Sequence, residues 1–95
     1  MILGYADRDT ERFAANLRVP RFEAFRNQAI RKLAQLHGAE GLDDLRVPPG
    51  NRLEALRGDR AGQHSIRING QYRLCFVWDA RAGGARDVEI VDYRR

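Results

Sequence analysis

The residues best suited to chemistry lie in and beside the stretch from Leu53 to Arg73, where arginines concentrate. These basic side chains are Arg52, Arg57, Arg60, Arg67 and Arg73. Sixteen of the seventeen basic residues in the chain are arginine, and Lys32 is the exception. A guanidinium can donate two parallel hydrogen bonds to a phosphate, whereas an ammonium acts as a point charge. This choice favours phosphodiester recognition, and the alternative left open is a set of solvated surface arginines.

The amino-acid totals limit both the fold and the partners. Ninety-five residues predict one domain over residues 1–95 with one hydrophobic core. A composition of 43% hydrophobic and 32% charged residues is typical of globular proteins, and the net charge of +4 favours nucleic acid or an acidic protein segment as partner. No apolar run approaches a membrane span, and Asp7, Arg8 and Asp9 come too early for a secretory signal, so we expect a cytoplasmic protein.

The cysteine usage bears on redox chemistry and on metals. Cys75 is the lone cysteine, so it cannot form an internal disulfide, and no CxxC or Cys/His spacing surrounds it. We expect a small buried or half-buried residue here rather than a nucleophile. The sequence therefore predicts no metal site and no cofactor.

Two helices are expected in the first half of the chain. Asp7 could cap the first, with Phe13, Ala14 and Leu17 as its buried side. Residues 21–37 have the apolar spacing of an amphipathic helix, and its buried positions would be Phe22, Phe25, Ala29, Leu33 and Leu36. Residues 2–5 could form an edge strand, and residues 41–45 one helical turn.

Strand-like runs occupy the second half, at residues 53–56, 64–68, 72–78 and 88–93. The loops between them are rich in glycine, as expected for tight connections between strands. Helices followed by an antiparallel meander predict an α+β fold. We expect the two N-terminal helices to pack on one face of a small antiparallel sheet.

Alternation along the strands assigns their side chains to faces. A two-residue turn at Asn69 and Gly70 would place the apolar sets of its two strands on opposite faces. A three-residue connection, or a bulge near Gly70, instead brings these sets together against the helices. The side chains brought together would be His64, Ile66, Ile68, Tyr72, Leu74, Phe76 and Trp78. Ser65, Arg67 and Arg73 would then lie side by side on the uncovered face.

The same alternation places more groups on the uncovered face. The buried positions of the outer runs would be Leu53, Ala55, Val88 and Ile90, which sends Glu89 and Val91 outward. The chemically useful groups that converge there would be Glu54, Arg67, Arg73 and Tyr93, with Arg57 and Arg60 at the rim. A carboxylate, guanidiniums and a phenol can cleave RNA without a metal, because they can deprotonate the 2′-hydroxyl, stabilise the phosphorane-like charge and protonate the departing 5′-oxygen. The alternative for Glu54 is an ion pair with a neighbouring arginine.

Three motifs make the chain recognisable: L-E-A-L-R-G-D-R, S-I-R-I-N and V-D-Y. They resemble those of the HigB-type toxins of the RelE superfamily, the plasmid maintenance killer proteins of bacterial type II toxin–antitoxin systems. The resemblance covers nearly the whole chain and implies a RelE-like, microbial ribonuclease-like fold. It also implies a metal-independent, ribosome-dependent mRNA endoribonuclease that works through 2′-hydroxyl attack. The implied partners are the ribosome, mRNA and a HigA-like helix-turn-helix antitoxin, with DNA reached only indirectly through the antitoxin.

The resemblance assigns roles to individual residues. Arg57 stands at the basic position of the first motif and Arg73 at the sheet arginine after Tyr72, and both are implied to hold the scissile phosphate. Asp92 and Tyr93 match the C-terminal Asp-Tyr, where the tyrosine is implied to position the nucleotide or assist proton transfer. The other arginines expected to bind RNA are Arg52, Arg60, Arg67, Arg94 and Arg95.

One departure from the family pattern concerns the general acid or base. Many relatives end in Asp-Tyr-His, whereas here Arg94 follows Tyr93, and arginine is a poor proton shuttle. Either Glu54, His64 or Tyr93 takes this role, or the protein is a weakened enzyme that still binds RNA or the ribosome. His64 is expected to be structural, because alternation places it on the core side. A third hypothesis is an interaction domain whose basic face docks an acidic antitoxin segment.

Overall fold

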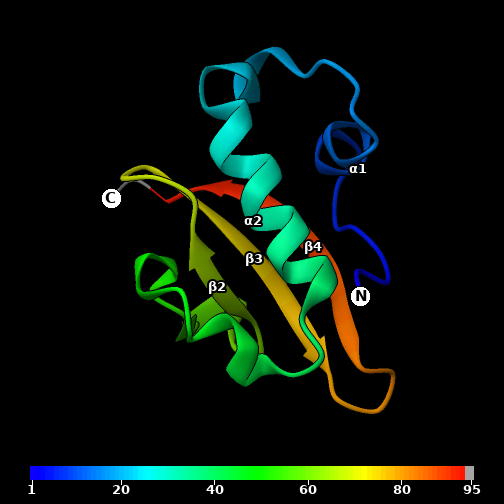
Figure 1. Cartoon of the computed structure of the whole chain (residues 1–95), viewed down its shortest axis with the longest axis vertical. Coiled ribbons are helices and arrows are strands. Elements are labelled where there is room, and N and C mark those ends of the chain that lie inside the picture. Colours follow the sequence, from blue (N-terminus) through cyan, green and yellow to red (C-terminus); the bar gives the residue numbers. More distant parts are fainter. Residues whose placement is uncertain (94–95) are drawn as a thin grey trace.

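In the computed structural model of the chain, which describes residues 1–93, two helices lie on one face of a four-stranded antiparallel sheet (Figure 1). The helices are α1 (Arg8–Ala14) and α2 (Arg26–Gly38), and the strands are β1 (Glu54–Ala55), β2 (His64–Arg67), β3 (Tyr72–Asp79) and β4 (Gly84–Asp92). The strands are neighbours in chain order, and the connections contain the 3-10 helices η1 (Pro20–Phe25), η2 (Leu42–Leu45), η3 (Pro49–Asn51) and η4 (Gly58–Arg60). The α+β prediction is confirmed. No helix within residues 1–93 is long and apolar enough to cross a membrane.

The first helix begins at the predicted cap. The carboxylate of Asp7 accepts a hydrogen bond from the backbone N–H of Thr10 at 3.4 Å, which satisfies one of the free donors of the first turn. Phe13 is fully buried and Ala14 packs against the core. The prediction that Leu17 is buried was wrong: it is 49% exposed, because the helix ends at Ala14.

The predicted second helix is two elements rather than one. The 3-10 helix η1 runs to Phe25, whose φ of −126° and ψ of 30° lie outside the α-helical region, and α2 begins at the next residue. A 3-10 helix repeats every three residues, so apolar spacing alone does not distinguish it from an α-helix. The predicted apolar face is nevertheless buried at Phe22, Phe25, Ala29, Leu33 and Leu36.

The connection between β2 and β3 has the predicted three residues. Ile66 lies opposite Leu74 in the antiparallel register. The side-chain oxygen of Asn69 accepts hydrogen bonds from the backbone N–H groups of Gln71 and Tyr72, both at 2.8 Å, and so closes the loop. As predicted, the side chains that pack into or against the core include Ile66, Ile68, Tyr72, Leu74, Phe76 and Trp78.

The outer strands agree with the predicted faces except at one residue. Val88 and Ile90 are buried, and a bulge at Asp87, with a φ of 52°, shifts the β3–β4 register between Cys75 and Val77. The prediction that Ala55 is buried was wrong, since it is exposed. The reason is that β1 is an edge strand, while α2 packs mainly against β3 and β4.

The N-terminal segment lies along the outer edge of β4 as two isolated parallel bridges, Ile2 with Ala85 and Tyr5 with Val88, rather than as a full strand. Backbone hydrogen bonds from Leu3 N to Ala85 O at 2.7 Å and from Ala85 N to Met1 O at 2.8 Å hold it there. This close approach requires glycine at position 84, because a Cβ there would collide with the Met1 carbonyl.

The buried hydroxyl of Thr10 also binds the outer edge of β4, and this contact leads to a prediction about stability. The side-chain oxygen of Thr10 accepts a hydrogen bond from the backbone N–H of Ile90 at 3.0 Å. Thr10→Val keeps the shape but leaves this buried N–H unpaired, so we expect a loss of about 1–3 kcal/mol in the free energy of unfolding, measured by urea denaturation. Thr10→Ser, which keeps the acceptor, is the control. Equal stability of the wild type and the valine variant would show that this bond does not stabilise the fold.

Candidate functional site

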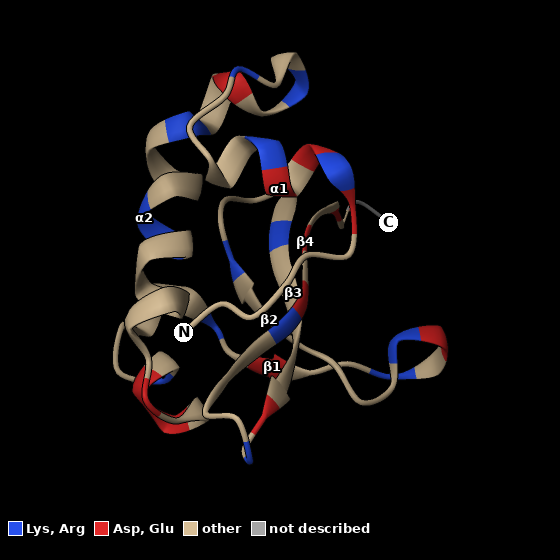
Figure 2. Cartoon of the chain, turned by 90° about the vertical axis from the view of Figure 1, so that its right-hand side faces the viewer, with Lys and Arg blue, Asp and Glu red and all other residues tan. Residues whose placement is uncertain are grey.

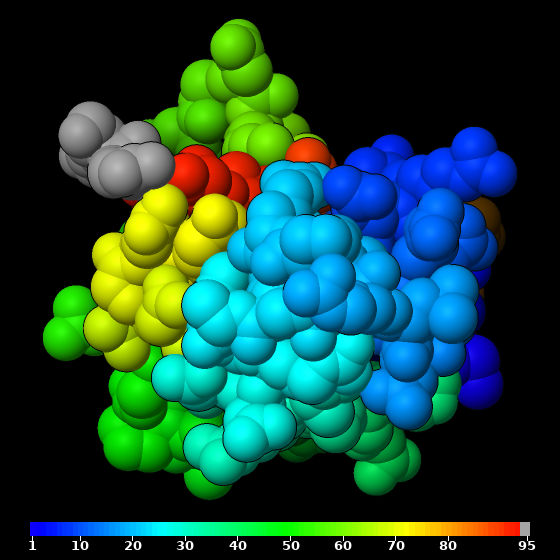
Figure 3. Space-filling model, turned by 90° about the horizontal axis from the view of Figure 1, so that it is seen from above, coloured from blue at the N-terminus to red at the C-terminus, as the bar shows by residue number. Residues whose placement is uncertain are grey.

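An open cleft lies beside the C-terminal end of β4. Its volume is about 690 Å³, and it is lined by Glu54, Ala55, Leu56, Arg57 and Tyr93. The backbone N–H of Tyr93 donates to the carbonyl of Gln71 at 2.7 Å, which fixes this end of the chain against the β2–β3 hairpin. In Figure 3 the end of β4 (red) lies between that hairpin (yellow) and the segment around residue 60 (green).

Arg73 is the most strongly held cation of this region, with a side chain only 12% exposed. Its Nε donates to Ser65 Oγ at 2.7 Å, and its Nη2 donates to the carbonyl of Arg52 at 2.7 Å. Glu54 Oε1 lies 3.7 Å from the same Nη2, and the Tyr93 ring centre lies 5.7 Å from Arg73 Cζ, within cation–π range. Nη1 has no hydrogen-bond acceptor within residues 1–93. The guanidinium is therefore fixed while one donor group remains for a ligand.

Two groups that orient Arg73, the Ser65 hydroxyl and the Arg52 carbonyl, were not predicted from the sequence to bind it. Ser65 was placed on this face, and it is fully buried beneath the guanidinium. Arg52 adopts a left-handed conformation, with φ 46° and ψ 54°, which is uncommon for a residue other than glycine or asparagine and lets its carbonyl reach Arg73. An arginine carries no sequence signal for this conformation. The only available signal for Ser65 was a small hydroxyl next to an arginine in the predicted register.

Glu54 and Arg57 lie at the cleft as expected from the alternation. Glu54 is half exposed and pairs in register with Ser65, so its carboxylate reaches the face that holds Arg73. The ion pair weighed as the alternative role of Glu54 is present, although 3.7 Å is long for a charge-assisted hydrogen bond. Arg57 is exposed and forms no ion pair within residues 1–93. Its guanidinium is thus available to an anion in the cleft.

Arg60, predicted at the rim, is held by contacts within the protein. It comes from the charged segment that projects from the sheet in Figure 2, and it forms an ion pair with Glu89 Oε1 at 3.2 Å. Its Nη1 also donates to Gln63 Oε1 at 3.1 Å. The pair links the β1–β2 connection to β4, and Glu89 lies on the uncovered face as predicted.

The remaining predicted site residues differ in where they lie relative to Arg73. Asp92 lies opposite Tyr72 in the β3–β4 register, so it points away from the face that holds Arg73, and its Oδ2 accepts a hydrogen bond from Gln71 Nε2 at 3.0 Å. Arg67 lies opposite Arg73 in the β2–β3 register and is half-buried. Arg94 and Arg95 lie outside the described residues.

Neither histidine borders the cleft. The ring of His64 stacks with that of Phe76 at 6.3 Å between centroids, on the core side as predicted, and burial followed by the nearby charge of Arg46 lowers the pKa of His64. His37 Nδ1 accepts a hydrogen bond from the backbone N–H of Ile2 at 3.1 Å. Within residues 1–93, no three His, Cys, Asp or Glu side chains are grouped to hold a metal ion.

Cys75 is fully buried, as predicted, and burial raises the pKa of its thiol to about 11. Because the thiolate is the reactive form, we expect iodoacetamide to label the native protein very slowly at mildly alkaline pH and rapidly in guanidinium chloride. Mass spectrometry of the single modified site measures both rates. Native labelling as fast as that of the unfolded chain would contradict this assignment.

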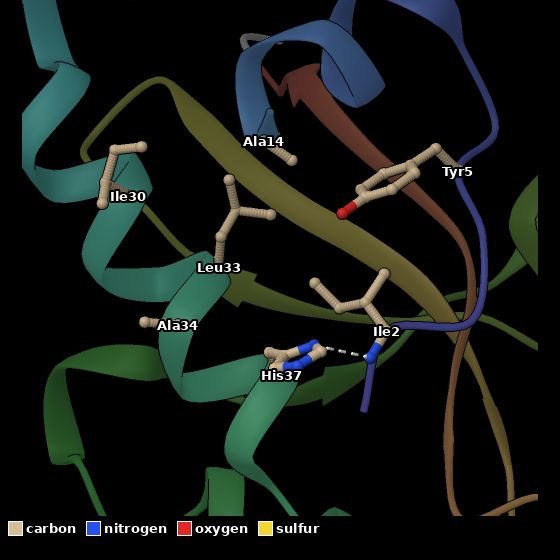
Figure 4. A pocket seen from close by; sticks show the side chains of 7 residues that line it. All are labelled: Ile2, Tyr5, Ala14, Ile30, Leu33, Ala34 and His37. Atoms are coloured by element: carbon tan, nitrogen blue, oxygen red, sulfur yellow. Dashed lines mark hydrogen bonds between the residues drawn. The ribbon is translucent and has the colours of Figure 1, made fainter. Parts of the chain in front are cut away.

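A second hollow, of about 380 Å³, lies between α1, α2 and the N-terminal segment. Figure 4 shows that its lining is mainly apolar, with the Tyr5 hydroxyl pointing into it. Burial and the charge of Glu11 raise the pKa of Tyr5, so this phenol is not adapted to give up its proton near neutrality. None of the described residues that line this hollow is an arginine or a carboxylate, so its lining lacks the groups for phosphate chemistry.

The sequence was compared with those of known proteins and their families. The sequence profile of the HigB-like toxins, described as RelE-like toxin of type II toxin–antitoxin system HigB, matches residues 5–93. Toxin HigB-1 of Vibrio cholerae is 42% identical over 80 residues, which cover 82% of this chain and 84% of that protein. An uncharacterized protein of Haemophilus influenzae is 43% identical over 49 residues, or 52% of this chain and 48% of its own length.

A solved structure, the YoeB/ParE toxin from Agrobacterium tumefaciens, is similar over 98% of this chain and 94% of that chain, with a TM-score of 0.46 and 22% identity. The family assignment depends on the sequence comparisons instead, because the profile match extends from residue 5 to residue 93 and the Vibrio toxin shares 42% identity over most of both chains. The chain therefore belongs to the HigB-like family of RelE-like toxins from type II toxin–antitoxin systems, in which the partner of the toxin is an antitoxin.

Proposed function

We propose that this toxin is a ribosome-dependent mRNA endoribonuclease that cleaves by attack of a 2′-hydroxyl, without a metal. The observation that carries the proposal is the oriented guanidinium of Arg73, with Glu54 and Tyr93 beside it at the cleft. Fixed donors aimed at developing negative charge are the main source of stabilisation for such a transition state. Membership of the HigB-like family supports RNA as the substrate.

In the proposed reaction, Arg73 and Arg57 hold the scissile phosphate. The 2′-oxygen attacks phosphorus, the bond from phosphorus to the 5′-oxygen breaks, and the products are a 2′,3′-cyclic phosphate and a 5′-hydroxyl. The role of the arginines is to neutralise the extra negative charge on the phosphorane-like transition state. Arg52 and Arg60 are proposed to add positive charge around the RNA.

The proton transfers are assigned to the two ionisable groups other than arginine that line the cleft. Glu54 accepts the proton of the 2′-hydroxyl, and Tyr93 positions the nucleotide and assists proton delivery to the departing 5′-oxygen. Asp92 has a positioning role: its carboxylate accepts a hydrogen bond from Gln71, and this contact keeps the end of β4 against the β2–β3 hairpin. Neither histidine can share this work, because both lie away from the cleft.

The proposed partners are the ribosome with its messenger and a HigA-like helix-turn-helix antitoxin, which would link the toxin indirectly to DNA. The net charge of +4 suits the first partner, since positive surfaces attract RNA. We also propose that residues 1–95 form a single toxin domain.

The test is cleavage of a defined messenger by the purified toxin with ribosomes, compared with the same messenger alone. We expect ribosome-dependent fragments with 2′,3′-cyclic phosphate and 5′-hydroxyl ends. Binding to ribosomes without any cutting would instead favour the second candidate, a catalytically weakened RNA- or ribosome-binding module. The absence of histidine from the cleft lining is the observation that keeps this candidate open.

A further inference from the structure

Asn51 is a fully buried polar residue at the end of η3, and its side chain is held by two parts of the chain. Its Oδ1 accepts a hydrogen bond from Lys32 Nζ of α2, and its Nδ2 donates to Gln35 Oε1 and to the carbonyl of Leu45, both at 3.1 Å. Lys32 and Gln35 are three residues apart, which places them on one face of the helix. Both the nitrogen and the oxygen of the buried amide therefore have partners, so the position of Asn51 is fixed relative to α2.

The residue after Asn51 has a strained backbone. Arg52 lies in the left-handed region, with φ 46° and ψ 54°, although this region favours glycine over residues with a Cβ. Such a conformation persists only where the surrounding structure imposes it. The anchored Asn51 imposes it on one side, and on the other side Leu53 packs against the core. The carbonyl of Arg52 is thereby directed at Arg73.

The Arg52 carbonyl is one of two anchors that set the plane of the Arg73 guanidinium. It accepts a hydrogen bond from Nη2 at 2.7 Å, while Ser65 Oγ accepts one from Nε at 2.7 Å. Without the first anchor the guanidinium would turn, and Nη2 would bond Glu54, whose Oε1 already lies 3.7 Å away. Such a turn would move Nη1 away from the phosphate and would also occupy the proposed base.

We propose that Asn51 is a positioning residue for Arg73: by holding Arg52 in its left-handed conformation, it keeps the guanidinium turned towards the scissile phosphate. The role given to Arg73 rests on the proposed function. These contacts also link α2, which lies on the covered face of the sheet, to a reaction on the uncovered face (Figure 1).

The first test is Asn51→Ala in a single-turnover cleavage assay with ribosome-bound messenger. Loss of the anchor should slow cleavage about 10- to 100-fold, the scale expected when a reacting group is misplaced by about an ångström, without weakening ribosome binding. Thr10→Val is the control, because it also leaves a buried polar group unpaired but lies outside the cleft lining. It should keep the wild-type rate, and an equal slowing in both variants would assign the effect to lost stability and overturn the proposal.

A double-mutant cycle tests whether Asn51 acts through Arg73. In the Arg73→Lys background the positioned guanidinium is already gone, so Asn51→Ala should slow cleavage by less than about twofold further. A full additional slowing would contradict the proposal, since a general structural role does not depend on which side chain stands at position 73.

Arg52→Gly and Arg52→Val test the part played by the backbone. Both remove the guanidinium, but glycine accepts the left-handed conformation and a β-branched residue opposes it. We expect the glycine variant to cleave about tenfold faster than the valine variant. Equal rates would count against the proposal, because the carbonyl would then hold Arg73 without this conformation.

The NMR signal of the Arg73 Nε–H gives a readout that does not need cleavage. The signal is identified by its loss in Arg73→Lys, and in the wild type the bond to Ser65 should protect it from exchange with solvent. Asn51→Ala should speed this exchange at least about tenfold, whereas Thr10→Val should not. If the wild type fails to cut messenger but this contrast is observed, the nuclease is lost and the positioning by Asn51 stands. An unchanged signal in Asn51→Ala would overturn the positioning role, whether or not the wild type cuts.

Discussion

Arg73→Lys is expected to slow cleavage of ribosome-bound messenger by about 100- to 1,000-fold, the range for removal of one oriented transition-state donor. Lysine keeps the positive charge, but its three N–H donors radiate from one nitrogen, so it cannot reproduce the separate positions from which Nε bonds Ser65, Nη2 bonds the Arg52 carbonyl and Nη1 faces the phosphate. The measurement is a single-turnover cleavage rate at saturating ribosome concentration, which separates chemistry from binding.

The control for this substitution is Arg81→Lys, because Arg81 is an exposed arginine outside the cleft lining. Thermal unfolding of both variants checks the fold, since Arg73 also bridges β2, β3 and the segment before β1. A rate for Arg73→Lys within a factor of two or so of the control would remove the basis for the catalytic role of Arg73, provided that both proteins are folded.

Phe22→Ala is expected to cost about 3–5 kcal/mol in the free energy of unfolding. Phe22 is fully buried, and its ring packs edge-on against Phe13 at 5.4 Å and Tyr72 at 6.5 Å between centroids. The Arg21 guanidinium lies 4.4 Å from its centre. Because domains of this size are stable by roughly 5–15 kcal/mol in total, a large part of that stability would be lost.

Urea denaturation measures this loss, with Leu17→Ala as the control, since Leu17 is 49% exposed and should change stability by no more than about 0.5 kcal/mol. Tyr72 makes the result relevant to the site, because it packs on Phe22 and directly precedes Arg73 in β3. A loss below about 1 kcal/mol would show that the core repacks around the missing ring.

Local alternation was sufficient to predict the part of the fold that holds Arg73. A slip of one residue at Gly70 would have exposed one apolar set, so the sequence excluded a two-residue turn, and of the two connections left open the three-residue loop is the one observed. The same reasoning placed Tyr93 and Arg73 on one face, and the distance of 5.7 Å between the ring and the guanidinium is consistent with it.

Features set by tertiary contacts could not be predicted from sequence. The carbonyl of Arg52 reaches Arg73 through an unusual backbone conformation, and the buried Asn51 and Thr10 have partners far along the chain. Arg60 was predicted at the rim of the cleft, and its ion pair with Glu89 depends on a loop path that alternation does not describe. Long-range polar pairing of this kind leaves no periodic pattern.

The two edges of the sheet differ in how they can accept another chain. Hydrogen bonds from the N-terminal segment and from the Thr10 hydroxyl occupy the outer edge of β4 from Ala85 to Ile90. A partner that extends a sheet needs unpaired backbone donors and acceptors, which leaves the short edge strand β1 as the place for such an addition. Since Glu54 of β1 also lines the cleft, an antitoxin strand added there would obstruct substrate entry by the same contact that anchors it.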